Sequence, residues 1–290
     1  MRGRLLFPRE HGAWGLISLP FVTGALVAGE WANLRMLAAT LAVISIFLLR
    51  TPLQVVWRYR AAARQSANQN RAAVTRTAQA AERPDLTNAR FSLAAYTSVA
   101  IGAGTYLLLT LPLAPLLWMA CGAAILILAI LFLAVRNYQR YPALQIVSAI
   151  GLTASSLPGY LAARGHLDAF AFWIWLLCAV DSSASVLVVH ARLEEIVASR
   201  KPGSSPLPHR RDAILAQAGL WIFLTILATQ GRPWLILPFL PTSVLHWWDL
   251  WQLGSPTRQR ISMQRVGLMQ LVASIAFCVI LIAVLRLSAF

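Results

Sequence analysis

The sequence predicts an all-α integral membrane protein with nine transmembrane helices, forming a single polytopic domain over residues 1–290. Hydrophobic residues make up 58 % of the chain and charged residues only 12 %. Soluble domains carry roughly 25 % charged residues, so this composition is typical of a chain that lies in a bilayer. Nine apolar stretches each approach the ~20 residues that a helix needs to cross the hydrocarbon region. The basic residues alternate between the two ends of these stretches, as they do in membrane proteins.

The nine predicted spans are apolar runs separated by polar or proline-containing segments. They cover residues 12–30, 35–57, 92–112, 114–135, 142–163, 168–190, 212–230, 233–252 and 266–288. With the N-terminus in the cytoplasm, 20 of the 25 Lys and Arg residues fall in cytoplasmic segments, four fall outside, and Arg50 lies within a span. This distribution predicts a cytoplasmic N-terminus and an external C-terminus. Membrane orientation and attraction to anionic lipid therefore account for the net charge of +15, and no nucleic-acid partner is predicted.

The first span begins with a polar stretch that reads Pro8-Arg9-Glu10-His11-Gly12-Ala13-Trp14-Gly15. Consecutive ionisable residues cost free energy at a membrane edge unless they cap a helix or line a polar space. One interpretation is an interfacial anchor, with Trp14 in the headgroup region. The other is that Glu10 and His11 face a polar cavity, while Gly12 and Gly15 allow another helix or a ligand to approach closely.

The second span contains the clearest anomaly, Arg50, about two turns before its cytoplasmic end. One explanation is that the guanidinium snorkels to the interface; the other is a binding role, because ionisable groups inside membranes commonly mark functional sites. Gln54 and Arg58 follow at i+4 and i+8, so the three residues share one helix face about 12 Å long. Arginine forms forked hydrogen bonds with phosphate or carboxylate, and this face is therefore predicted to bind an anionic group.

Two long cytoplasmic loops follow the second and sixth spans, at residues 58–90 and 191–211. The first is rich in Ala, Arg and Gln, which favour helices, and we expect a polar surface helix that Pro84 ends. The second begins as a helix and breaks between Lys201 and Pro208. The outer loops are short, so the mouth of any cavity is expected on the cytoplasmic side.

The sixth and eighth spans carry the remaining candidate residues. Asp181 lies at mid-span, where it must be protonated, paired or in a wet cavity. His190 and Glu194, at i and i+4, form either a weak metal pair or, as we favour, a helix-end ion pair. His246 and Asp249 lie among tryptophans that indicate an aromatic belt, and they either belong to that belt or point inward. A further hypothesis is that polar residues at the cytoplasmic ends of the first, second, sixth and eighth spans converge on one cavity. They are Glu10, His11, Arg50, Arg58, His190, Glu194, His246 and Asp249.

Other kinds of site find little support in the sequence. The three cysteines, Cys121, Cys178 and Cys278, lie far apart inside apolar runs, so they are interpreted as buried packing thiols and no metal site is predicted. The sequence contains no P-loop, GxGxxG, GxSxG or HExxH motif. Haem ligation by two histidines is disfavoured because the candidates lie near the ends of spans. No cofactor is assigned.

The stretch at residues 8–15, followed by Leu19-Pro20 and Gly24, resembles the opening of the YwiC-like family of bacterial membrane proteins. This resemblance implies a bacterial cytoplasmic (inner) membrane protein and no particular chemistry. The layout of nine spans with long loops after the second and sixth also resembles the UbiA-type prenyltransferases, whose Asp-rich motifs hold magnesium and diphosphate. Here the comparable segment, residues 50–58, contains no carboxylate, and the second motif would fall near His190 and Glu194.

We therefore predict a YwiC-like membrane protein that binds an anionic or amphipathic ligand, such as an anionic lipid or an isoprenoid, in an intramembrane cavity. Arg50 and Arg58 are its expected anchors, with His11 and His190 nearby. One alternative is a UbiA-like transferase that acts on a lipid (prenyl) diphosphate. Another is a non-catalytic subunit or assembly factor of a membrane complex.

Overall fold

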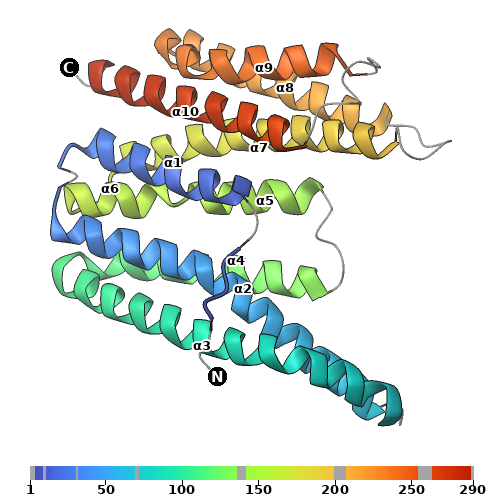
Figure 1. Cartoon of the computed structure of the whole chain (residues 1–290). Coiled ribbons are helices and arrows are strands. Elements are labelled where there is room, and N and C mark those ends of the chain that lie inside the picture. Colours follow the sequence, from blue (N-terminus) through green and yellow to red (C-terminus); the bar gives the residue numbers. More distant parts are fainter. Residues whose placement is uncertain are drawn as a thin grey trace. The chain divides into compact units, whose positions relative to one another are not determined.

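The computed structural model describes residues 4–8, 11–30, 32–68, 72–135, 142–198, 207–253 and 263–288, and in these ranges the chain is helical and contains no strand. The α-helices are α1 (His11–Ala28), α2 (Leu34–Asn68), α3 (Ala72–Thr110), α4 (Leu113–Val135), α5 (Pro142–Thr153), α6 (Ser156–Arg164), α7 (Ala169–Ala198), α8 (Leu207–Thr229), α9 (Leu240–Trp251) and α10 (Met263–Ser288). A 3₁₀-helix, η2 (Pro233–Phe239), precedes α9. Figure 1 labels the α-helices. The predicted all-α class is confirmed.

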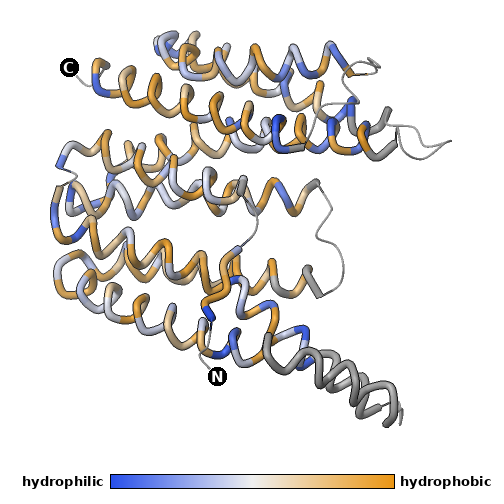
Figure 2. Tube along the Cα trace, viewed as in Figure 1, coloured by the Kyte–Doolittle hydropathy of each residue, from blue (hydrophilic) through white to orange (hydrophobic). Residues whose placement is uncertain are grey.

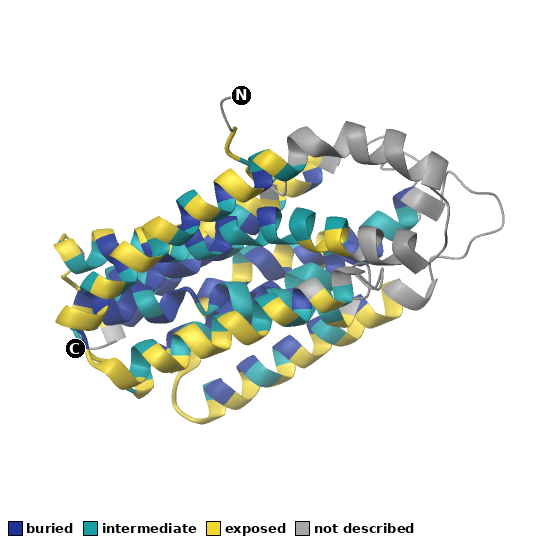
Figure 3. Ribbon diagram, turned by 90° about the horizontal axis from the view of Figure 1, so that it is seen from below, coloured by how far each residue is buried: buried dark blue, intermediate teal, exposed yellow. Residues whose placement is uncertain are grey.

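Seven helical segments among the described residues are long and apolar enough to cross a bilayer. They are Leu34–Arg60, Leu86–Thr110, Leu113–Ile130, Ala143–Arg164, Ala169–Ile196, Arg210–Thr229 and Gln264–Leu287. The first predicted span corresponds to a shorter apolar helix, Gly12–Ala28, and the eighth to η2 followed by α9. Hydrophobic residues run along all these helices (Figure 2), and exposed positions alternate with buried ones (Figure 3). Large apolar side chains such as Leu109 and Trp118 are more than 80 % exposed, as lipid contact requires.

Contacts divide the chain into two compact units, and each is described by itself. Unit 1 comprises Met1–Glu10 and Ala32–Gln139, and unit 2 comprises His11–Trp31 and Arg140–Phe290. In unit 1, α2 packs along α3, and α4 contacts both. In unit 2, α1 packs on α6 and α10, α7 lies against α5 and α8, and η2 and α9 contact both α8 and α10. The single polytopic domain stays a prediction.

The N-terminal segment at residues 4–8 is held against α3 by hydrogen bonds. The backbone amide of Leu6 donates to Ser92 Oγ at 2.9 Å, and Tyr96 donates its hydroxyl proton to the Leu6 carbonyl at 3.0 Å. One turn earlier on α3, Asn88 Oδ1 accepts from the Arg4 amide at 2.9 Å. The three α3 residues are spaced at i, i+4 and i+8, so a single helix face satisfies the backbone of this irregular segment.

Apart from residues 69–71, which lie outside the described residues, the polar segment between the second and third spans is helical and continues the two spans rather than forming a separate surface helix. α2 continues to Asn68, and α3 begins at Ala72 and runs through Pro84 without a break. The expectation that Pro84 ends a helix was therefore wrong. An interior proline costs about 3 kcal/mol in a helix, and here strong helix formers precede it while a membrane span follows it in the same helix. In the second long loop α7 extends to Ala198 as expected; residues 199–206, where the break was predicted, lie outside the described residues.

The fifth predicted span, residues 142–163, is interrupted between α5 and α6 at Ala154–Ser155. The interruption brings α6 against α1 at two glycines. A Cβ atom on Gly24 would collide with the Ser156 carbonyl oxygen, and one on Gly159 with a backbone oxygen of α1. Ser155 donates its hydroxyl proton to the Ile17 carbonyl at 2.6 Å. Backbone contact through small residues is a common way for helices to associate in lipid.

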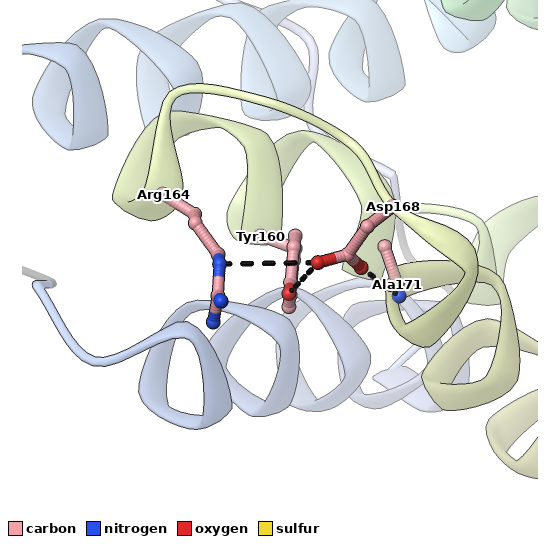
Figure 4. Close-up of polar contacts among 4 residues, drawn as sticks. All are labelled: Tyr160, Arg164, Asp168 and Ala171. Carbon is pink, nitrogen blue, oxygen red and sulfur yellow. Dashed lines mark hydrogen bonds and ion pairs between the residues drawn. The ribbon is translucent and has the colours of Figure 1, made fainter.

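Polar side chains also satisfy backbone groups at helix ends in unit 2. Arg286 in α10 donates from Nε to the Leu26 carbonyl at 3.0 Å, at the last turn of α1, where helix carbonyls lack amide partners. Between α6 and α7, Asp168 accepts from the Ala171 amide at 3.1 Å and from the Tyr160 hydroxyl at 2.8 Å, as Figure 4 shows. The carboxylate thus satisfies an amide in the first turn of α7.

Candidate functional site

The polar face predicted on the second span lies on α2 in unit 1. α2 is an unbroken helix from Leu34 to Asn68, so Arg50, Gln54 and Arg58 share one side of it. Arg50 and Gln54 are half-buried and Arg58 is exposed. Gln54 Nε2 is buried and has no hydrogen-bond partner among the described residues. An amide donor in this position costs free energy unless an acceptor reaches it.

The other candidates near the N-terminus are described less fully. Glu10 lies outside the described residues, and for His11 only the backbone, the first residue of α1, is described. Trp14 is half-buried in α1. A Cβ atom on Gly15 would meet Leu271 Cδ1 at 3.1 Å, whereas Gly12 faces open space. The polar cavity proposed for Glu10 and His11 stays a prediction.

In unit 2 the buried carboxylates of α7 and α9 connect these two helices. Thr242 Oγ1 donates to Asp181 Oδ1 at 2.7 Å, and Asp181 is 2 % exposed. Three turns further along α7, Arg192 forms an ion pair with Asp249, and both side chains are buried. The two contacts follow the same order along both helices, so α7 and α9 run in the same direction. This direction agrees with their positions as the sixth and eighth spans.

Sequence reasoning missed Arg192, which was counted with the second cytoplasmic loop. The signal was its distance of eleven residues from Asp181, about three helical turns, which puts both on one face of α7. The ion pair neutralises Asp249 inside the protein. Removal of either partner from a buried pair costs about 3–5 kcal/mol, because the other charge stays buried without compensation.

His246 is fully buried and joins three helices. Its Nδ1 lies 3.1 Å from Gln217 Nε2 of α8, and its Nε2 lies 3.3 Å from Gln270 Oε1 of α10. A neutral imidazole fits both contacts, because one ring nitrogen accepts from the Gln217 amide and the other donates to the Gln270 carbonyl oxygen. Thus His246 and Asp249 point inward, whereas Trp247, Trp248 and Trp251 in the same stretch are exposed. The exposed tryptophans and the two buried polar residues therefore lie on different sides of α9.

His190 and Glu194 approach each other at the end of α7, with His190 Nε2 and a Glu194 carboxylate oxygen 4.0 Å apart. This geometry matches the helix-end pair that we favoured. The described residues contain no group of three or more His, Cys, Asp or Glu side chains placed to hold a metal ion.

The prediction of buried cysteines holds for two of the three. Cys178 in α7 and Cys278 in α10 are buried, and all three thiols are free. Cys121 in α4 is exposed, so this part of the prediction was wrong. The apolar environment that surrounds Cys121 in the sequence belongs to a lipid-facing helix surface, where an apolar side chain need not be inside the protein.

Comparison with known families gives one match. A family model described as "YwiC-like protein" matches residues 7–163, from the N-terminal polar stretch to the end of α6. The match includes the whole α2 face. No curated protein and no solved structure matches the chain. The resemblance to the UbiA-type layout therefore stays a prediction.

Proposed function

The chain belongs to the YwiC-like family of membrane proteins, and on that premise we propose that it binds an anionic, amphipathic ligand on the α2 face formed by Arg50, Gln54 and Arg58. The observation that carries this proposal is the buried Gln54 amide nitrogen, which lacks an acceptor among the described residues and lies one helical turn from an arginine on either side.

The chemistry of the three donors favours a phosphate or carboxylate. Successive members of the face are about 6 Å apart along the helix axis, a spacing that long arginine side chains can bridge to one oxyanion. Arginine contributes forked hydrogen bonds, and the Gln54 amide would supply one more donor. The face belongs to the apolar segment Leu34–Arg60 that is long enough to span a bilayer, so a ligand with an apolar tail would keep its anionic group at this depth.

The basic residues support an orientation for this site. With the N-terminus in the cytoplasm and the C-terminus outside, 20 of the 25 Lys and Arg residues lie on the cytoplasmic side, and the α2 face lies at the cytoplasmic end of its span. We therefore place the ligand in the cytoplasmic leaflet of a bacterial inner membrane. A prenyltransferase reaction would in addition need oxygen ligands for Mg²⁺, and residues 50–58 offer no carboxylate for them.

Thermal unfolding of the detergent-purified chain with farnesyl diphosphate, with and without Mg²⁺, tests this proposal. A ligand at a hundred times its Kd stabilises a protein by about 2.7 kcal/mol. We expect stabilisation without Mg²⁺, and we expect it to be lost in Arg50→Ala and Arg58→Ala but kept in Arg60→Ala. Arg60 is the matched control, because it is an exposed arginine of the same helix off this face.

The proposal would be refuted if neither farnesyl diphosphate nor an anionic phospholipid stabilised the protein. Stabilisation that survived in Arg50→Ala and Arg58→Ala would place the anion elsewhere. Stabilisation that required Mg²⁺ would instead favour the transferase alternative. Farnesol serves as the neutral control, since it has the same tail without the anionic group.

A further inference from the structure

A second surface of the protein, in unit 2, carries unpartnered polar groups of a different kind. A groove of about 730 Å³ lies between α8 and α9 and is lined by Trp221, Ser243, Trp247, Trp248, Trp251 and aliphatic residues of α9. We call it the tryptophan groove. Its volume is within the range of small-molecule sites, and no charged residue lines it. Trp251 is 75 % exposed, so the groove is open at the surface that faces lipid.

Two hydrogen-bond donors in the tryptophan groove have no partner among the described residues. Ser243 is 1 % exposed, and both its Oγ and the indole Nε1 of Trp221 are buried. A serine inside a helix usually satisfies its hydroxyl on the carbonyl four residues earlier. For Ser243 that carbonyl is Phe239, which the Thr242 hydroxyl already approaches at 3.1 Å. Unpartnered buried groups of this kind cost free energy and are uncommon in native proteins.

A second apolar groove in the same unit provides a comparison, because its lining donors have partners. This groove, of about 430 Å³, is formed by α5, α7 and α8 and also contains a serine and a tryptophan. Ser183 donates its hydroxyl proton to the Ala179 carbonyl at 2.6 Å, and Trp175 Nε1 donates to the Ile150 carbonyl at 3.1 Å. Both donors are thus satisfied by backbone carbonyls. The tryptophan groove therefore differs from the second groove in that its lining donors lack an acceptor among the described residues. Ser156 Oγ, Ser185 Oγ and Gln270 Nε2 of unit 2 are also buried without a partner there, but they line neither groove.

We propose that the tryptophan groove binds a neutral, membrane-soluble carbonyl compound with a flat ring, the chemistry of a lipid quinone. Rotation of the Ser243 hydroxyl and a small shift of the Trp221 ring would bring the two buried donors to a ring carbonyl oxygen, which accepts hydrogen bonds from Ser243 Oγ and Trp221 Nε1 while the ring lies against the indole walls. An indole N–H can only donate, so the ligand must supply the acceptor. The site is separate from the α2 face and does not depend on the proposed function.

Depth and charge select this class of ligand over ordinary phospholipids. Ser243 lies about halfway along the predicted span of residues 233–252, far from the headgroup region. A charged or zwitterionic headgroup placed there would lose its hydration without any counter-charge in the lining. A neutral ring on an apolar tail reaches that depth at little cost, and flat rings pack favourably against aromatic walls.

The test is a titration of the full-length protein in detergent with a decyl-substituted benzoquinone, with thermal stability as the readout of an apparent Kd. We expect saturable stabilisation, weakened about tenfold in Ser243→Ala and in Trp221→Phe, which keeps a ring and removes the N–H. Ser183→Ala in the second groove is the matched control and should bind as the wild type does. Without ligand, Ser243→Ala should be as stable as the wild type or more so, because it removes a buried hydroxyl that lacks a partner.

Several outcomes would overturn the inference. They are the absence of saturable binding, unchanged affinity in both groove variants, or equal weakening in Ser183→Ala. Equal stabilisation by decylbenzene would show that the tail alone binds, and would overturn the role of the carbonyl. Arg50→Ala should retain quinone binding, and Ser243→Ala should retain the response to farnesyl diphosphate, so failure of one site is distinguishable from failure of the other.

Discussion

Replacement of Arg192 by methionine should destabilise the protein far more than loss of an ordinary ion pair. Methionine keeps an unbranched side chain of similar length and removes the charge. The Arg192 and Asp249 side chains are only 7 % and 5 % exposed, so the substitution leaves a buried carboxylate without its cation. Loss of one partner from such a pair costs about 3–5 kcal/mol. Asp249→Leu should lower the free energy of unfolding by a similar amount, because it leaves the buried Arg192 guanidinium without the Asp249 carboxylate.

The double variant Arg192→Met/Asp249→Leu distinguishes this mechanism from a loss of packing. With both charges gone no buried charge is stranded, and we expect the double variant to recover most of the stability that either single variant loses. The measurement is equilibrium unfolding of the detergent-purified protein, arranged as a double-mutant cycle. Arg164→Met provides a control, because Arg164 and Asp168 form an ion pair whose side chains are 46 % and 35 % exposed, for which a loss of roughly 0.2–1 kcal/mol is expected.

The reasoning would be refuted if the losses in the two single variants simply added in the double variant. It would also fail if Arg192→Met cost no more than Arg164→Met. Either result would mean that water or lipid headgroups reach the pair and screen it, so that it behaves as a surface pair.

Two further predictions concern packing and accessibility. Gly24→Ala should destabilise the protein by about 1–3 kcal/mol or more, because its new methyl group collides with a backbone carbonyl of α6. Gly12 faces open space, so Gly12→Ala should be neutral in the same unfolding assay. A lipid-soluble maleimide should label the folded protein at Cys121 and leave Cys178 and Cys278 unreacted until denaturation, as peptide mass spectrometry would show. Labelling of Cys178 at the rate of Cys121 would contradict the burial of the Cys178 side chain in α7.

The sequence was sufficient for the helical class and for the position of most spans, because membrane helices are specified by local composition. It was also sufficient to single out Asp181 and Asp249 as anomalies. Their partners, Thr242 and Arg192, were not foreseen, because a side chain at a span end looks the same whether it reaches water or a neighbouring helix. The three-turn spacing of Asp181 and Arg192 puts both on one face of α7, but it does not identify the residues of α9 that they contact.

The break between α5 and α6 was missed for a related reason. Residues 142–163 are apolar enough for one continuous helix, and the interruption at Ala154–Ser155 adjoins the contacts that Ser155 and Ser156 make with the backbone of α1. The tryptophan groove was likewise read only as an aromatic belt. Trp221 and Ser243 lie on different helices, and only their shared lack of acceptors makes them a candidate site.

The hydrogen bond between Arg286 and the Leu26 carbonyl can form only after nearly the whole chain has been synthesised. The two residues are 260 positions apart in the chain. At a synthesis rate of about 5–20 residues per second, α1 leaves the ribosome roughly 13–50 s before the guanidinium that binds its last turn. During that interval the end of α1 needs lipid headgroups, water or the insertion machinery to satisfy its carbonyls. A nascent chain stalled before α10 should therefore expose the end of α1 to protease or chemical modification, and completion of the chain should close it.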